Sequence, residues 1–144
     1  MITTYCGAVY PWQCDHMGHM NVQYYAAKFD EATWQLLGAL GLTPTYLRNT
    51  NRGMVAIDQK TKYKREVIAG DTVEICSDVL EIREKSIRFV HIMKKTESGE
   101  VVAESEFTGV HIDTVTRRGF VFPEEVVAAV AKLIPHKKDV SSIA

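Results

Sequence analysis

The feature that most constrains this chain is a long strand-like run from Met54 to Asp113, interrupted only by short turn segments. Apolar and polar residues alternate along it, as on a sheet whose two faces meet different surroundings. The run predicts four antiparallel strands, MVAIDQKTKYKREV, DTVEICSDVLEIR, SIRFVHIMKKT and VVAESEFTGVHIDTV, separated by IAG, EK and ESGE. In the second strand the apolar phase changes between Ile75 and Leu80, which predicts a bulge or a strong bend.

One amphipathic helix is predicted before these strands, from Val22 to about Leu40. Its apolar residues recur at three- and four-residue spacing, and its polar residues occupy the opposite face. Gly38, Gly41 and the following Pro44 end the helix. The next segment, YLRNTNRG, is expected to be a loop before the chain becomes extended.

Three shorter features complete the predicted layout. Ile2–Tyr10 is a β-branched and aromatic stretch that stops at Pro11, as expected of a first strand. PEEVVAAVAKLI begins with proline and two glutamates, which favour a helix start, and residues 135–144 are expected to be a flexible tail. The fold class is therefore α+β, with a five-stranded antiparallel sheet and one long helix. Because one helix does not cover so long a sheet, we expect a homodimer or homotetramer.

Composition narrows the class of protein. With 144 residues, 46% of them hydrophobic and 24% charged, the chain is expected to form a single domain over residues 1–134. A formal net charge of −1 and the lack of a long basic run predict no nucleic-acid partner. No window is apolar enough to span a bilayer, and the three cysteines fit no disulfide framework. We therefore expect a cytoplasmic protein with reduced thiols and no membrane partner.

The stretch WQCDHMGHMNVQYY, just before the predicted helix, concentrates reactive side chains. Asn21 stands one residue before the helix, where its side chain is expected to accept a hydrogen bond from an N–H two or three residues on. The Val22 N–H then remains unpaired at the positive end of the helix dipole, where it can stabilise an oxyanion. Asp15 is the candidate base or nucleophile, and Gly18 lets the backbone approach a ligand.

The same stretch carries a family resemblance. Asp15, then Gly18-His19, then Asn21 and Tyr25 resemble the D-x-x-G-H-x-N-x-x-x-Y pattern of hotdog-fold acyl-CoA thioesterases, the group that includes 4-hydroxybenzoyl-CoA thioesterase. The later YKREVIAGDTVEI is similar to the same family's strand, Gly-Asp turn and strand. With the matching order of elements, the resemblance covers about residues 3–125.

The resemblance implies a hotdog fold, in which an antiparallel sheet wraps a long central helix and the active sites lie between subunits. It also implies an acyl-CoA thioesterase that hydrolyses an acyl thioester to free acid and coenzyme A, with no cofactor. Asp15 matches the family's catalytic carboxylate, and Val22 falls where the family's backbone oxyanion donor lies. The identity of the acyl group, and the choice between coenzyme A and an acyl-carrier protein, stay open.

Further substrate-binding residues are expected near this loop. Tyr24 and Tyr25 are packing residues that can also line an acyl pocket. His19 is expected to order the loop by hydrogen bonding or to act as a general acid. The period-two residues Lys60, Lys62 and Lys64 of QKTKYKRE, with Arg65 after them, are expected to form a basic stripe on a strand. This stripe is either a solvated edge or a contact surface for coenzyme A phosphates.

Two other functions remain open from the sequence. A hotdog hydratase or dehydratase would use a histidine base, for which His19 and His91 are the candidates. A non-catalytic acyl-thioester binding protein would keep the fold without turnover. No metal site is predicted, because Cys14, His16 and His19 lack a second ligand pair at a recognisable spacing.

Overall fold

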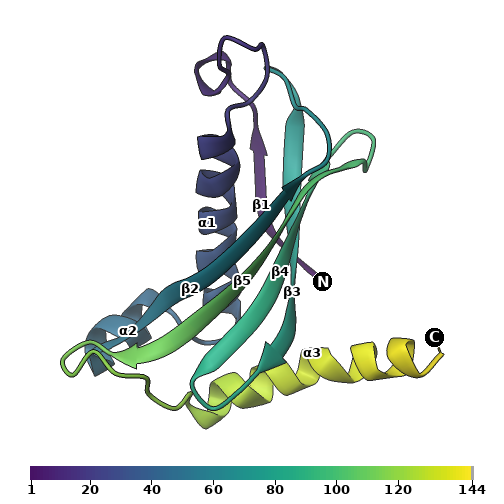
Figure 1. Ribbon diagram of the computed structural model, residues 1–144. Coiled ribbons are helices and arrows are strands. Elements are labelled where there is room, and N and C mark those ends of the chain that lie inside the picture. The colour runs from purple at the N-terminus through teal and green to yellow at the C-terminus, as the bar shows by residue number, and fades with distance from the viewer. Residues whose placement is uncertain (144) are drawn as a thin grey trace. The chain divides into compact units, whose positions relative to one another are not determined.

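The computed structural model describes residues 1–143, with side chains for residues 1–133. The chain begins with the strand β1 (Ile2–Ala8), the short 3₁₀ helix η1 (Pro11–Gln13), the long helix α1 (Val22–Ala39) and the helix α2 (Pro44–Thr50) (Figure 1). It continues with the strands β2 (Arg52–Tyr63), β3 (Thr72–Ile82), β4 (Ser86–Lys95) and β5 (Val101–Asp113), and the helix α3 (Glu124–Ile143). Every strand and helix predicted from the sequence is therefore present.

The strands form one sheet in the order β1-β3-β4-β5-β2, so β1 and β2 are its edges. β1 pairs with β3 in antiparallel register. Just beyond one end of β2, the Lys64 N–H donates to the Val102 carbonyl at 2.8 Å. Gly53, near the other end of β2, lies against Ile112 in β5, so these two strands also run in opposite directions. The predicted α+β fold, with the long helix α1 and a five-stranded antiparallel sheet, is confirmed.

The chain forms two compact units. The first consists of Met1–Leu36, Lys60–Asp78 and Val90–Glu106, and the second of Leu37–Gln59, Val79–Phe89 and Phe107–Ala144. The single domain predicted over residues 1–134 stays a prediction. The predicted flexible tail, residues 135–144, overlaps the last part of α3, where side chains are not described, and its flexibility stays a prediction.

In the first unit, α1 lies beside β1 and buries one apolar face (Figure 1). Tyr25, Phe29, Ala32 and Leu36 are all buried, at the spacing that predicted an amphipathic helix. Fully burying a large side chain contributes about 1.5–3 kcal/mol, so this face anchors the helix. The packing fixes where the first turn of α1 begins.

A chain of buried hydrogen bonds links the helix and the strands of the first unit. The Thr33 hydroxyl in α1 lies 2.8 Å from His91 Nε2 in β4, and the other ring nitrogen of His91 bonds the Ser77 hydroxyl in β3. Ser77 in turn bonds the Thr4 hydroxyl in β1 at 2.7 Å. Burial lowers the pKa of His91 to about 4, so its ring is neutral near pH 7.

These bonds explain one error in the sequence analysis. The predicted phase change between Ile75 and Leu80 is absent, because the buried positions of β3 continue in one alternating row through Ser77. The strong bend stays a prediction. Ser77 is polar but buried, so its residue type hid its place in the pattern. The pairing of β1 with β3 does contain an irregularity, but it lies in β1, where the register shifts between Thr3 and Tyr5.

In the second unit, the segment expected to be a loop contains the helix α2. Its start is set by Thr43, whose hydroxyl accepts a hydrogen bond from the Tyr46 N–H at 3.1 Å, and by Pro44 in the first turn. It ends at Asn51, in the left-handed conformation with φ of 55°. The loop prediction was wrong because it took the Asn and Gly residues as loop signals, whereas Asn51 ends a helix. Tyr46 OH lies 3.1 Å from Nε2 of the buried His111, which holds α2 in place.

The last helix, α3, also belongs to the second unit. It begins after Pro123 with Glu124 and Glu125 in its first turn, as predicted. Val126 and Val130, one turn apart, are its buried contacts. Within the part of the chain that is described, every helix is too short or too polar to cross a membrane.

Candidate active site

The loop between η1 and α1 turns back on itself. Cys14 and Met20 form an isolated antiparallel bridge, and the Asp15 N–H donates to the His19 carbonyl at 3.1 Å. The Gly18 N–H donates to the Asp15 carbonyl at 3.0 Å. Gly18 has a φ of 88°, in the region that residues with a Cβ rarely adopt. The tight turn therefore returns the chain from Asp15 to the start of α1.

The carboxylate of Asp15 is held by two hydrogen bonds within this loop. The side-chain amide of Asn21 donates to Oδ2 at 2.9 Å, and the Met17 N–H donates to Oδ1 at 2.9 Å. The bond from Asn21 and then that from Met17 lower the pKa of Asp15 below its ordinary value. Asp15 is therefore ionised near neutral pH, which suits a nucleophile or a general base.

Asn21 is also the N-cap of α1, as predicted. Its side-chain oxygen accepts a hydrogen bond from the Gln23 N–H at 3.1 Å. Among the described residues, none accepts a hydrogen bond from the Val22 N–H, and the Val22 side chain is exposed. A free N–H at a helix N-terminus is a donor for a developing negative charge.

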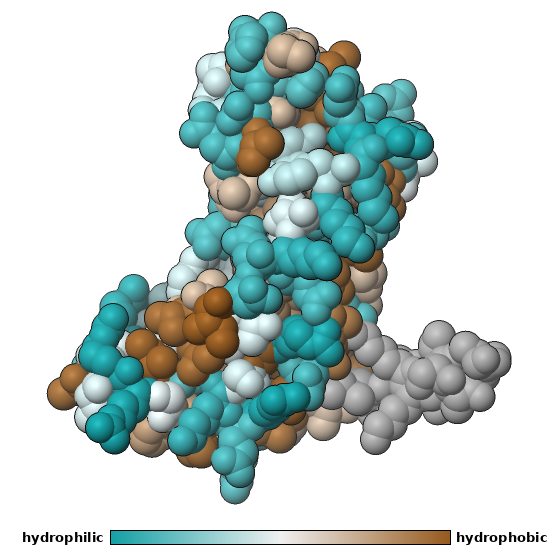
Figure 2. Space-filling view, in the orientation of Figure 1, coloured by the Kyte–Doolittle hydropathy of each residue, from teal (hydrophilic) through white to brown (hydrophobic). Residues whose placement is uncertain are grey.

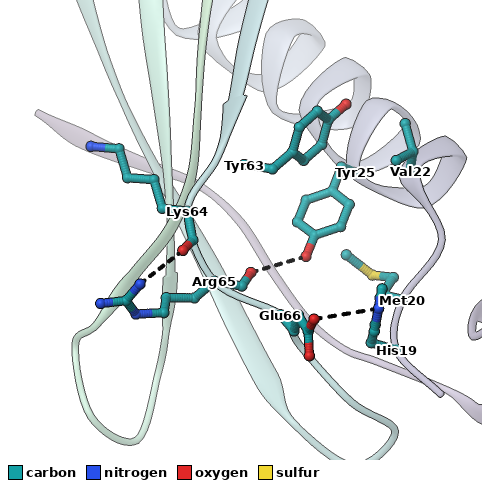
Figure 3. Close-up of a pocket in the computed structure, with 8 residues that line it drawn as sticks. All are labelled: His19, Met20, Val22, Tyr25, Tyr63, Lys64, Arg65 and Glu66. Carbon is teal, nitrogen blue, oxygen red and sulfur yellow. Dashed lines mark hydrogen bonds and ion pairs between the residues drawn. The ribbon is translucent and has the colours of Figure 1, made fainter. Parts of the chain in front are cut away.

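A cavity of about 210 Å³ opens beside the first turn of α1 (Figure 3). Tyr25 OH, inside it, donates to the Arg65 carbonyl at 3.4 Å, and burial raises the pKa of Tyr25, which keeps this hydroxyl protonated. His19 Nε2 lies 3.5 Å from the Glu66 carboxylate. The lining residues are His19, Met20, Val22, Tyr25, Tyr63, Lys64, Arg65 and Glu66.

The structure brings only some of the predicted site residues together. Asp15, Gly18, His19, Asn21 and Val22 share the loop and the helix start, and the cavity adds Tyr25, Lys64 and Arg65. Tyr24 instead packs its ring edge-on against Trp12, with the ring centroids 5.6 Å apart.

The basic residues Lys60, Lys62, Lys64 and Arg65 are divided between two surfaces. Lys60 and Lys62 line a separate cavity of about 100 Å³, together with Glu104 and Glu106. Lys64 lies beyond the end of β2 and pairs with Glu104 at 3.0 Å.

Two residues of the cavity were missed by the sequence analysis. The ring of Tyr63 lies 5.1 Å from that of Tyr25, at an interplanar angle of 85°. Glu66 faces His19 from the segment after β2. Both stand within the basic stripe KTKYKRE, where the lysines drew attention instead. Their contacts are with residues of the loop and of α1, which no local pattern reveals.

The second histidine proposed for a hydratase is not at this site. His91 is fully buried, stacks on Phe29 at 5.9 Å and bonds Thr33 and Ser77. It lines neither of the two cavities described above. We therefore find no observation in favour of a histidine-based hydratase. Within the residues described, no three His, Cys, Asp or Glu side chains are grouped to hold a metal ion.

Comparisons with known proteins identify the family. The model of the thioesterase-like superfamily matches residues 9–130, most of the chain. The chain belongs to this superfamily. A betainyl-CoA thioesterase of Pseudomonas aeruginosa is 27% identical over 133 residues, covering 92% of this chain and 84% of that protein. An L-carnitine dehydrogenase/betainyl-CoA thioesterase of Agrobacterium fabrum is 29% identical over 119 residues, covering 83% of this chain but only 24% of that longer protein.

A solved structure supports the same fold. A Staphylococcus aureus protein, determined in complex with CoA, superposes with a TM-score of 0.85 at 21% identity. The match covers 92% of this chain and 85% of that chain. The predicted hotdog fold is confirmed, and so is the predicted enzyme class, a thioester hydrolase of the thioesterase-like superfamily.

Proposed function

We propose that this chain hydrolyses an acyl-CoA thioester, with Asp15 as the catalytic carboxylate and the Val22 N–H as the oxyanion donor. The observation that supports this most is the double role of Asn21, which bonds Asp15 and caps the helix beginning at Val22. One side chain thereby couples the position of the carboxylate to that of the N–H donor. Acyl transfer depends on such fixed relative positions.

Two chemical routes use these groups. In the first, an Asp15 oxygen attacks the carbonyl carbon, the C–S bond breaks with release of the thiolate, and water then hydrolyses the mixed anhydride. In the second, Asp15 takes a proton from a water molecule, which attacks the carbonyl carbon directly, and the C–S bond then breaks with release of the thiolate. In both, the Val22 N–H stabilises the carbonyl oxygen as it becomes negative, a contribution of about 2.7–4 kcal/mol for one such donor. A thiol with a pKa of about 8.5 leaves readily, so neither route needs a metal.

A single turnover in water enriched in heavy oxygen tests the first route. If Asp15 is the nucleophile and water attacks the carboxyl carbon of Asp15 in the anhydride, the first acid released carries an oxygen of the carboxylate and the label appears in the protein. Label in the first acid with an unlabelled protein is the result of the general-base route, or of water attack on the acyl carbon of the anhydride.

We propose a small acyl group as the substrate, of the class that betainyl-CoA represents. The relatives from P. aeruginosa and A. fabrum are named for this substrate. The cavity beside Val22, about 210 Å³, is smaller than the roughly 300–1,000 Å³ of sites for drug-sized ligands. The S. aureus protein in complex with CoA supports coenzyme A, rather than an acyl-carrier protein, as the carrier.

Basic residues beside the cavity are proposed to contact the phosphates of coenzyme A. Lys64 and Arg65 are the nearer pair, since both line the cavity, and Lys60 and Lys62 extend the basic surface. Lys64 pairs with Glu104 at 3.0 Å, but surface ion pairs of this kind contribute at most about 1 kcal/mol and are readily exchanged for a phosphate. His19 is proposed to order the loop around Gly18 through its pairing with Glu66.

We further propose that the chain is a homodimer or homotetramer in the cytoplasm. β2 is an edge strand, with a neighbouring strand of the sheet on one side only. It exposes Val55 and Ile57, whose exposed fractions are 37% and 63%. Figure 2 shows hydrophobic side chains gathered on the face that carries β2. A second copy would cover this edge.

The proposed function is tested by free-thiol release from a panel of short, long, aromatic and cationic acyl-CoAs. Wild-type protein should turn over at least one member, and Asp15→Asn should slow it by about a hundredfold or more. Glu31→Gln, which removes an exposed carboxylate elsewhere on α1, serves as the matched control. A folded wild-type protein that binds acyl-CoA but releases no thiol would instead be an acyl-thioester binding protein.

A further inference from the structure

The cavity beside Val22 contains a right-angled aromatic corner. The rings of Tyr25 and Tyr63 have centroids 5.1 Å apart and an interplanar angle of 85°. Tyr25 is fixed from both ends, since it belongs to α1 and its hydroxyl bonds the Arg65 carbonyl. Tyr63 is 49% exposed, so part of its ring is available to a ligand. A compact cation can therefore contact the ring of Tyr63, with the buried Tyr25 as the wall behind it.

The charges around this corner favour a cation. The side chains of Lys64 and Arg65 point away from the two tyrosines (Figure 3). The Lys64 ammonium pairs with Glu104 at 3.0 Å, and the Arg65 guanidinium lies 3.8 Å from Glu100. Glu66 is different, because its carboxylate faces the cavity and, among the described residues, its ion pair is with the imidazole of His19, at 3.5 Å.

The position of the corner also fits a very short acyl group. Val22 and Tyr25 lie one helical turn apart in α1 and line the same cavity. A carbonyl oxygen bound by the Val22 N–H would therefore place only the first few atoms of the acyl group in this space. In a betainyl group, the quaternary nitrogen is separated from the carbonyl carbon by a single methylene. A volume of about 210 Å³ is sufficient for a trimethylammonium group.

We infer that Tyr25, Tyr63 and Glu66 form a subsite for a quaternary ammonium group on the acyl part of the substrate. This inference rests on the proposed thioesterase function and names the residues that select the acyl group. Tyr63, which is 49% exposed, attracts the cation through its ring, Tyr25, which is 4% exposed, forms the buried wall behind it, and Glu66 adds a carboxylate. Met20, also in the wall, offers a polarizable thioether to the methyl groups.

Two substrates of the same shape test the inference. Betainyl-CoA carries a trimethylammonium group, and tert-butylacetyl-CoA carries an uncharged tert-butyl group in its place. Wild-type protein should hydrolyse betainyl-CoA with a kcat/KM at least about tenfold higher, which corresponds to about 1.4 kcal/mol. In the ratio of the two kcat/KM values, any effect common to both substrates cancels, such as a change in coenzyme A binding or in Asp15.

Variants at the corner should change this ratio. Tyr63→Leu removes a ring and should lower the ratio about tenfold, whereas Tyr63→Phe keeps the ring and should leave the ratio near that of the wild type. Glu66→Gln should lower the ratio severalfold at low salt and less at high salt, since the carboxylate is 74% exposed. Glu31→Gln removes the same charge from an exposed position on α1 and should leave the ratio unchanged.

Failure of the subsite and failure of the enzyme function give different results. Equal kcat/KM for the two substrates in the wild type would overturn the subsite while leaving the thioesterase in place. A ratio that survives Tyr63→Leu and Glu66→Gln would also overturn it. Release of thiol from neither substrate, nor from any other acyl-CoA of the panel, would overturn the proposed function and the subsite with it.

Discussion

Asn21 holds Asp15 by donating its side-chain amide to the carboxylate at 2.9 Å, while its own side-chain oxygen caps α1 at the Gln23 N–H. A single amide thus links the start of the long helix to the catalytic carboxylate proposed for the loop. The amide oxygen satisfies the helix, and the amide nitrogen stabilises the charged form of Asp15. The two functions predict separable effects of substitution.

Asn21→Ala should shift the acid limb of the pH–rate profile to higher pH. The bond from Asn21 lowers the pKa of Asp15, so the active carboxylate persists to lower pH in the wild type than an ordinary aspartate would. Its removal raises that pKa, and activity is then lost earlier on acidification. The loss of the cap should also lower the free energy of unfolding by about 1 kcal/mol.

Asn21→Ser separates these effects, because serine is a good N-cap but lacks the amide. It should keep most of the stability in urea denaturation yet still show the shifted acid limb. An acid limb that stays in place in both variants would contradict the assignment of Asp15 as the titrating group.

The buried His91 predicts a loss of stability on mild acidification. Its pKa is lowered from 6.5 to about 4 by burial, so between these values the unfolded chain binds a proton that the folded chain does not. Stability is therefore greatest above about pH 6.5 and falls as the pH drops toward 4, by about 3 kcal/mol in total. Urea denaturation between about pH 5 and 7 measures this slope, above the range in which carboxylates titrate.

His91→Gln is the matching variant, since glutamine can bond both Thr33 and Ser77 but does not titrate. Its stability should depend less on pH over the same range. Some slope should remain, because burial also lowers the pKa of His111. An unchanged slope would mean that His91 is not the group responsible.

The sequence predicted what depends on local spacing and missed what depends on distant contacts. The cap at Asn21 and the buried face of α1 follow from the spacing of residues close in the chain, and both are present. Ser77 was misread because its partners, His91 and Thr4, lie in other strands. A polar residue enters a buried row only when such partners are supplied, and no local pattern shows them.

The candidate site divides in the same way. Asp15, Gly18 and Val22 are close in the chain, so their association through the loop could be anticipated. The cavity wall could not, because Tyr63 reaches the site only when β2 is brought beside the first turn of α1. The stripe of lysines next to it follows a simple period of two but leads to different surfaces, since β2 ends at Tyr63, before Lys64.

The cap of α2 predicts a further effect on stability. Thr43 accepts the hydrogen bond of the Tyr46 N–H at 3.1 Å, and Tyr46 holds the buried His111. Thr43→Ala should therefore lower the free energy of unfolding by about 1 kcal/mol, whereas Thr43→Ser, which keeps the oxygen, should lower it much less. Urea denaturation of the three proteins decides this. Equal losses in both variants would show that the methyl group of Thr43, rather than its hydroxyl, matters.

Two glycines should respond in opposite directions to the same substitution. Gly18 has a φ of 88° and no neighbouring atom within 4 Å of the place that a Cβ would occupy, so Gly18→Ala adds backbone strain without a steric clash. It should lower the free energy of unfolding by about 1–2 kcal/mol and reduce thiol release, because the loop that carries Asp15 is displaced. Gly38 has equally open space at this place but lies inside α1 with an ordinary helical backbone.

Gly38→Ala should therefore raise the free energy of unfolding by about 0.5–1 kcal/mol, since alanine restricts the unfolded chain and favours the helix. Its thiol release should match that of the wild type, because the substitution lies at the far end of α1 from Val22. Thermal denaturation of the two variants, measured side by side, checks that Gly18→Ala loses stability and that Gly38→Ala gains it. Their kcat/KM values check that only Gly18→Ala loses activity. If Gly18→Ala were as stable and as active as Gly38→Ala, the left-handed turn would not be what positions Asp15.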